Sequence, residues 1–120
     1  DGADGAAGDQ LSMPLVLGIT SNVTMRRIGA VSNVATTLDE IYVRTHGGTC
    51  TARFYRGTGQ NVIAFATGGP TQAVTTTGTA IALADTNTTG AYAPLWITVT
   101  AASSLTGLDV IISAHRTPAA

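Results

Sequence analysis

The sequence contains no lysine, a single cysteine, few aromatic residues and few charges of either sign. Only 11% of its 120 residues are charged and the formal net charge is −1, with arginine as the only cationic residue apart from two histidines. Binding to a phosphate backbone requires a basic face, so this composition argues against nucleic acid as a partner. Without lysine, the chain also cannot form a P-loop, whose lysine contacts the phosphates.

Long hydrophobic runs are absent as well. The longest unbroken apolar stretches cover residues 62–66 and 80–84, far short of the ~20 residues that span a bilayer. We therefore predict no membrane insertion. The lone cysteine, Cys50, cannot form a disulfide within the chain. It alternates with Ala52 and Phe54, which predicts that it faces the core as a small apolar side chain.

Metal-binding patterns are incomplete. Residues 85–90 begin like a calcium loop of the form D-x-N-x-x-G, but Trp96 occupies the twelfth position, where a bidentate glutamate is needed. The same residues favour a polar turn. His46 and Cys50 supply only two ligands across a glycine hairpin, too few for a tetrahedral site. We predict no metal and no cofactor.

Catalytic patterns are missing too. There is no G-x-S-x-G nucleophile motif. Asp39 and Glu40 are adjacent, so on a strand they are expected to point to opposite faces. His115 is expected to be exposed and without a role. We predict that the protein is not an enzyme, because nucleophile, base and orienting group cannot be assembled. Asn22 and Asn87 begin N-x-T sequons, which matter only in a eukaryotic secretory pathway.

The sequence opens with glycine at every third position, at Gly2, Gly5 and Gly8. A Gly-X-Y period is the signature of collagen, because only glycine fits at the axis where three chains meet. Residues 1–10 are therefore interpreted as the end of a collagen-like stalk, with a flexible leader as the alternative. On the first interpretation, the three glycines lie near a three-fold axis and the chain is a homotrimer.

The remainder, residues 11–120, is predicted to be one β domain. Threonine is the commonest residue, at 21 positions, and β-branched residues suit pleated sheets. Apolar and polar residues alternate with the period of a half-buried strand. The alternation predicts that Ile111 faces outward and that seven side chains face the core: Ile41, Val43, Phe54, Ile97, Val99, Val110 and Ile112. Glycine-containing turns separate the runs. The pattern predicts strands near 11–19, 23–32, 38–45, 49–56, 60–67, 71–76, 79–84, 95–100 and 108–115, with a turn at 87–90. We expect an all-β, antiparallel, jelly-roll-like sandwich of about eight strands.

Residues 23–117 resemble the small β-sandwich heads of tailed-phage structural proteins. The likeness is carried by the Leu-X-X-hydrophobic-X-Val strand at residues 38–45 and the Leu-X-Val-X-Ile-X-Ala-X-Arg strand at 108–116. Such heads in turn resemble the trimeric jelly rolls that follow collagen-like stalks in complement-type proteins. The sequence departs from the phage pattern at residues 91–94, where Ala-Tyr-Ala-Pro replaces Gly-Asp.

The resemblance implies a non-enzymatic virion protein, exposed on a phage tail or capsid, whose trimeric head caps or anchors a collagen-like fibre and contacts other virion structural proteins. The alternative is an adhesin head that binds a host glycan. Sugar-binding surfaces commonly use exposed aromatic rings. The candidate ligand-binding residues on that alternative are Tyr55, Tyr92 and Trp96, although Trp96 is also a candidate for a subunit interface.

Overall fold

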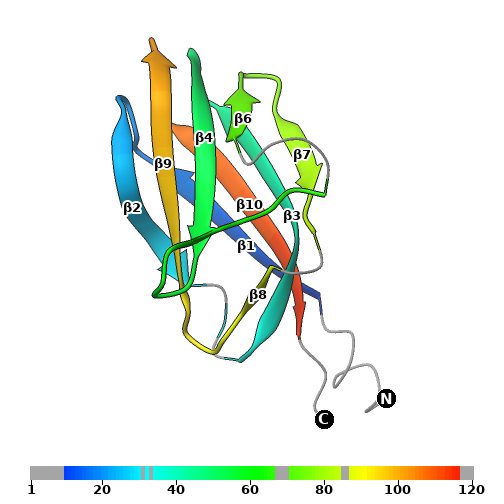
Figure 1. Ribbon diagram of the computed structural model, residues 1–120. Coiled ribbons are helices and arrows are strands. Elements are labelled where there is room, and N and C mark those ends of the chain that lie inside the picture. Colours follow the sequence, from blue (N-terminus) through cyan, green and yellow to red (C-terminus); the bar gives the residue numbers. More distant parts are fainter. Residues whose placement is uncertain (1–9, 31, 33, 67–70, 85–86, 117–120) are drawn as a thin grey trace.

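The protein is an all-β sandwich (Figure 1). The computed structural model describes residues 10–30, 32, 34–66, 71–84 and 87–116, so the glycines at positions 2, 5 and 8 lie outside the described residues. No helix occurs within these ranges. The strands are β1 (Gln10–Leu17), β2 (Val23–Ala30), β3 (Thr36–Thr45), β4 (Thr49–Arg56), β5 (Asn61–Val62), β6 (Thr71–Val74), β7 (Thr79–Ala82), β8 (Thr88–Thr89), β9 (Pro94–Ser103) and β10 (Leu108–Arg116).

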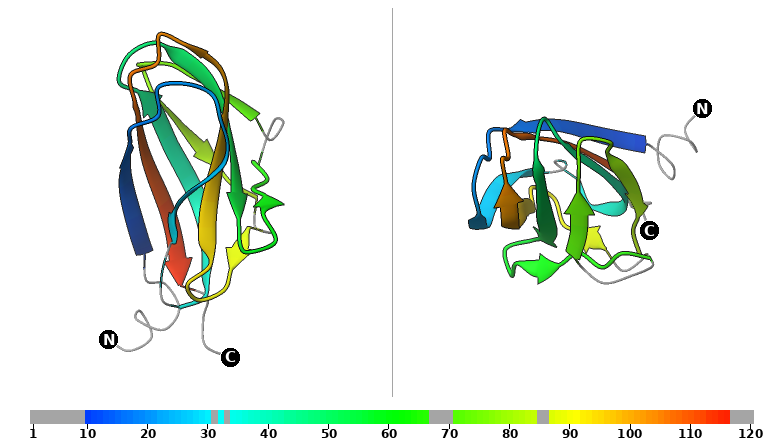
Figure 2. Two further views of the ribbon diagram at one scale, coloured as in Figure 1. Left: turned by 90° about the vertical axis from the view of Figure 1, so that its left-hand side faces the viewer. Right: turned by 90° about the horizontal axis from the view of Figure 1, so that it is seen from above.

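The strands form two antiparallel sheets that pack as two layers (Figure 2). Sheet A has the order β1-β10-β3-β7, with β8 also pairing with β3. Sheet B has the order β2-β9-β4-β5, with β6 also pairing with β4. The short strands β5 and β6 share one side of β4, and β7 and β8 share one side of β3. The architecture is thus equivalent to eight strand positions in a jelly roll, which confirms the predicted fold class.

The core lies between the two sheets and is built from the inward phase of each strand. Seven of the side chains that alternation assigns to the core are at most 1% exposed: Ile41, Val43, Phe54, Ile97, Val99, Val110 and Ile112. The side chain of Cys50 is also inside, at 4% exposed. Because successive side chains of a strand point to opposite sides of the sheet, the residues between these core positions form the outer faces of the molecule.

The expected strand at 60–67 is shorter than predicted. Only Asn61 and Val62 form a strand with β4, and Phe65 makes an isolated bridge with Leu83 beside sheet A. The segment therefore crosses from one sheet to the other, and its backbone partners change along the way. The N–H of Ile63 donates to the carbonyl of Phe54 in sheet B, whereas Ala66 N–H donates to Ala82 in sheet A.

The prediction of a turn at 87–90 was wrong, because Thr88 and Thr89 form the strand β8. Asn87 makes this path possible. Its side chain is fully buried, with Oδ1 accepting from Ala64 N–H at 2.9 Å and Nδ2 donating to the carbonyls of Ala64 and Ala84 at 2.6 and 2.8 Å. The carbonyls of Ala64 and Ala84 also accept backbone N–H groups, whereas the N–H of Ala64 pairs with the side-chain amide in place of a neighbouring strand.

The register defines two ends of the sandwich (Figure 1). Gln10 at the start of β1 pairs with His115 near the finish of β10, so the first and last described strands share one end. We call this the terminal end; the connections 57–60 and 90–93 also lie there. The opposite or distal end carries the connections 18–22, 46–48, 75–78 and 104–107.

Candidate functional site

The outer face of sheet A carries the most distinctive surface. The register aligns Val16, Asp109 and Arg44 in one row across β1, β10 and β3. The next row towards the terminal end holds Pro14, Ile111 and Tyr42. Residues aligned in this way on one face of a sheet are close enough for their side chains to touch.

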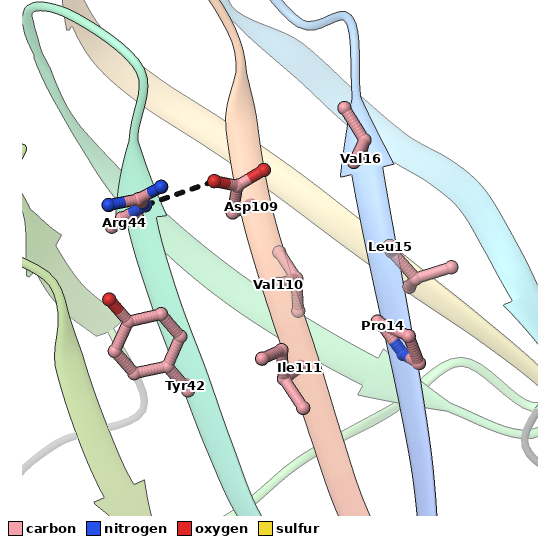
Figure 3. A pocket seen from close by; sticks show the side chains of 8 residues that line it. All are labelled: Pro14, Leu15, Val16, Tyr42, Arg44, Asp109, Val110 and Ile111. Carbon is pink, nitrogen blue, oxygen red and sulfur yellow. Dashed lines mark hydrogen bonds and ion pairs between the residues drawn. The ribbon is translucent and has the colours of Figure 1, made fainter.

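These two rows enclose an open groove of about 420 Å³ (Figure 3). Pro14 and Val16 form one wall from β1, Tyr42 forms the other from β3, and Ile111 lies between them on β10. Val16 is 77% exposed and Ile111 is 37% exposed. Large apolar side chains that gather on an outer face, rather than being scattered singly, are typical of interaction surfaces. We therefore treat this groove as the candidate site.

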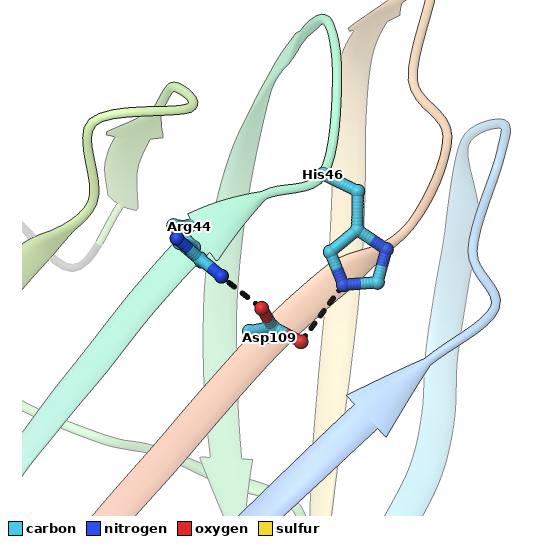
Figure 4. Close-up of polar contacts among 3 residues, drawn as sticks. All are labelled: Arg44, His46 and Asp109. Carbon is cyan, nitrogen blue, oxygen red and sulfur yellow. Dashed lines mark hydrogen bonds and ion pairs between the residues drawn. The ribbon is translucent and has the colours of Figure 1, made fainter.

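A charged cluster closes the distal side of the groove (Figure 4). Nε2 of His46 donates to Oδ1 of Asp109 at 2.8 Å, and Nε of Arg44 donates to Oδ2 at 3.0 Å. These two hydrogen bonds, the one from His46 first, hold the pKa of Asp109 below its ordinary value. Both carboxylate oxygens are consequently engaged, and the cluster presents no unpaired carboxylate to the groove.

His46 is positioned by tightly packed turns at the distal end. Its backbone N–H donates to the carbonyl of Gly107 at 2.9 Å, and Thr106 N–H donates to Gly47 at 3.2 Å. A Cβ on Gly107 would lie 2.6 Å from Nδ1 of His46, and one on Gly48 would lie 2.3 Å from the carbonyl oxygen of Ser103. The turns approach so closely that glycine is required at both places.

A second acid–histidine pair lies on the same face, towards the terminal end. Nδ1 of His115 donates to both carboxylate oxygens of Asp39, at 2.8 and 2.9 Å. His115 is therefore half-buried and hydrogen-bonded, whereas the sequence predicted an exposed side chain. A bulge between Ser113 and Ala114 explains the position of Asp39: Leu38 and Ile41 both face the core, so neither intervening carboxylate does. Asp39 and Glu40 do not point to opposite faces as expected.

Two of the three aromatic candidates meet on the outer face of sheet B. Tyr55 on β4 is the cross-strand partner of Trp96 on β9. Tyr55 is only 9% exposed, and the Arg53 guanidinium lies 5.6 Å from the centre of its ring. Trp96 is half-buried and donates from Nε1 to the carbonyl of Gly57 at 2.9 Å. Little of the tyrosine ring is left for stacking against a ligand.

Tyr92 lies outside the strands, in the connection between β8 and β9 at the terminal end, and is 71% exposed. Its φ of 61° is in the left-handed region, which bulky residues rarely adopt. The backbone N–H of Tyr92 donates to the carbonyl of Ser32 at 2.8 Å, which holds the turn in place.

The side chains considered for metal binding are separated or committed elsewhere. Cys50 faces the core, where burial raises the pKa of its thiol, whereas His46 binds Asp109 on the outer face. The Asn87 amide is used by the backbone of residues 64 and 84, which also makes it inaccessible as a glycosylation acceptor. Across the described ranges, no three His, Cys, Asp or Glu residues gather closely enough to hold a metal ion. Those ranges also contain no helix long and apolar enough to cross a membrane.

Comparison with known proteins identifies no family. No protein-family model matches the chain, and no curated protein sequence shows significant similarity to it.

The groove on sheet A was not identified from the sequence, although part of its signal was present. Alternation already placed Ile111 in the outward phase of its strand, opposite Ile112. A large aliphatic residue in a polar phase indicates that something covers that face. What sequence could not show is that Pro14, Val16 and Tyr42 lie beside Ile111, because this depends on the pairing of three strands that are distant in the chain.

Proposed function

We propose that this chain is the non-enzymatic head of a trimeric fibre protein on the surface of a phage tail or capsid. In this proposal residues 1–10 are the end of a collagen-like stalk, and residues 11–120 are the head that caps or anchors it. The observation that carries the proposal is the direct continuity between the Gly-X-Y run and β1, an edge strand that begins at the terminal end of the sandwich.

The layout of the head supports this role. Because β1 begins and β10 ends at the terminal end, a stalk would attach there and leave the distal end free. Three collagen chains need a nucleus that brings them together in register, and a head that trimerises supplies one. The head would contact other virion structural proteins of the same particle.

The arrangement can be tested with cysteines introduced at the two ends of the full chain. If three stalks converge on one axis, the three copies of residue 10 lie close together. Gln10→Cys should then form disulfide-linked dimers rapidly under mild oxidation at micromolar concentration. Thr20→Cys is the matched control, because Thr20 is also exposed but lies at the distal end.

The native Cys50 is buried in both variants and serves as an internal reference for unwanted oxidation. Cross-linking of Gln10→Cys that is no faster than that of Thr20→Cys would contradict the convergence of the chains at the terminal end. Fast cross-linking of both variants would indicate non-specific association instead.

A host-glycan adhesin is the second candidate, and it is favoured by one observation. The half-buried ring of Trp96 on sheet B is flanked by Arg27 on β2 and by Tyr55 on β4. Rings beside arginines suit a sugar that carries an acidic group. A glycan array probed with the full chain would test this: binding that is lost in Trp96→Ala and retained in Tyr92→Ala would favour the adhesin.

A further inference from the structure

The two outer faces of the sandwich differ in charge. The outer face of sheet B carries two arginines, Arg27 on β2 and Arg53 on β4, and the strands of this sheet contain no Asp or Glu. The other two arginines of the sheet, Arg26 and Arg56, pair with residues that face the core, and Arg56 donates to the carbonyl of Thr88 in sheet A. Within the described part of the chain, neither Arg27 nor Arg53 takes part in an ion pair. Covering Arg27 and Arg53 would remove water from charges that no ion pair among the described residues neutralises, which is costly. The face of sheet B is therefore suited to solvent.

Sheet A has the opposite character. Its outer face includes Val16 and Ile111, both exposed, and the groove beside Tyr42. The charged residues at the rim of the groove are already paired, because Asp109 accepts from both Arg44 and His46. A partner that covers this surface would bury no unpaired charge, and its binding would remove apolar side chains from water.

The position of β1 indicates which partner this is. If three stalks meet on an axis, β1 is the strand that leaves that axis in each copy. Pro14 is four residues from Gln10, about 13 Å along an extended strand, so the groove begins close to the point where the three chains converge. A neighbouring copy is the molecule that the proposed function places there.

We propose that the groove formed by Pro14, Val16, Tyr42 and Ile111 on the outer face of sheet A is the contact surface for a second copy of this chain. The inference rests on the proposed trimer and specifies which face builds it. Three such contacts around an axis give a closed ring, in which the groove of each copy meets a different surface of the next copy. Arg27 and Arg53, on the outer face of sheet B, remain on the outside.

The contact is made by side chains and not by extension of the sheet. β1 is an edge strand, and its free backbone edge is a potential template for pairing with another strand. Pro14, near the middle of β1, lacks an N–H and is typical of edges that do not pair further. The apolar face beside that edge is then the surface available for docking.

The test is the oligomeric state of the full chain carrying Ile111→Arg, compared with Thr100→Arg. Both changes add one positive charge to an exposed strand position, the first in the groove and the second on the outer face of sheet B. We expect Ile111→Arg to raise the concentration at which the trimer dissociates at least tenfold, as measured by light scattering after gel filtration. Thr100→Arg should dissociate at the same concentration as the unmodified chain.

Val16→Asp provides a second variant that folding should tolerate, because Val16 is 77% exposed. A far-ultraviolet circular dichroism spectrum matching that of the unmodified chain would show that each variant is folded. Trimers of unchanged stability in both Ile111→Arg and Val16→Asp would overturn the inference and leave the trimeric fibre head standing. An unmodified chain that is monomeric would instead remove the proposed function and the inference together.

Discussion

Gly48 is the residue whose replacement the structure constrains most tightly. Its φ is +76°, and a Cβ there would lie 2.3 Å from the backbone oxygens of Ser103 and Ser104. Those oxygens belong to another turn and cannot move as a flexible side chain would. We expect Gly48→Ala to reduce the free energy of unfolding by about 2–4 kcal/mol, from left-handed strain together with steric overlap.

Urea denaturation at a fixed protein concentration would measure this loss. Gly18→Ala is the matched control, because Gly18 lies at the same end of the sandwich and a Cβ there meets nothing within 4 Å. Its effect should remain within about 0.5 kcal/mol. Equal losses in the two variants would contradict the close packing of the distal turns.

Asp109 makes a pH-dependent contribution to the stability of the fold. Its pKa is lowered in the folded chain by the hydrogen bonds from His46 and Arg44. A carboxylate of this kind stabilises the fold at pH values above its unfolded pKa, roughly 3.9, and the contribution disappears as the pH falls through the folded pKa.

Asp109→Asn should therefore lower the melting temperature at pH 7, and the difference from the unmodified chain should shrink steadily below about pH 4. Circular dichroism melts at a series of pH values would follow this change. A difference that is constant from pH 7 to pH 2.5 would show that the charge of Asp109 is not what the neighbouring side chains stabilise.

Individual strands were largely predictable, because local alternation reports which side chains face the core. It placed Ile41 and Val43 correctly on β3 and Val110 and Ile112 on β10. It did not find the bulge opposite Ser113, since a bulge is a property of two paired strands and not of one. The pairing of His115 with Asp39 was missed for the same reason: the two residues are 76 positions apart and meet only through the register.

The segments that cross between the sheets were the least predictable elements. Residues 87–90 have the composition of a turn, yet two of them pair with β3, because buried Asn87 supplies hydrogen bonds that no local pattern reveals. We expect Asn87→Ala to reduce the free energy of unfolding by about 2–4 kcal/mol, since it leaves the N–H of Ala64 without its partner and removes one of the two hydrogen bonds that the carbonyls of Ala64 and Ala84 each accept.

Asn22→Ala is the control for that prediction, because the Asn22 side chain is exposed and makes a single hydrogen bond, to the N–H of Ala102. Hydrogen exchange gives a second measurement. The amide of Ala64 should lose protection in Asn87→Ala, while the central strands keep theirs. Retained protection at Ala64 would show that another group can replace the side-chain amide.

In the whole molecule, charged side chains are distributed differently over the outer faces of the two sheets. All three described acids, Asp39, Glu40 and Asp109, lie in sheet A, whereas the outer face of sheet B carries Arg27 and Arg53 and no acid. Composition alone showed a nearly neutral chain and could not reveal this division, because it emerges only when the strands are assigned to sheets. The same assignment brings the exposed apolar residues of β1 and β10 together in one groove.

The central claim is that three copies of this chain form one head, and the mass of the full chain under native conditions tests it most directly. Native mass spectrometry at micromolar concentration should detect one dominant species of three 12.1 kDa chains, about 36 kDa in total. A spectrum that contains only the 12.1 kDa monomer under those conditions would contradict the account.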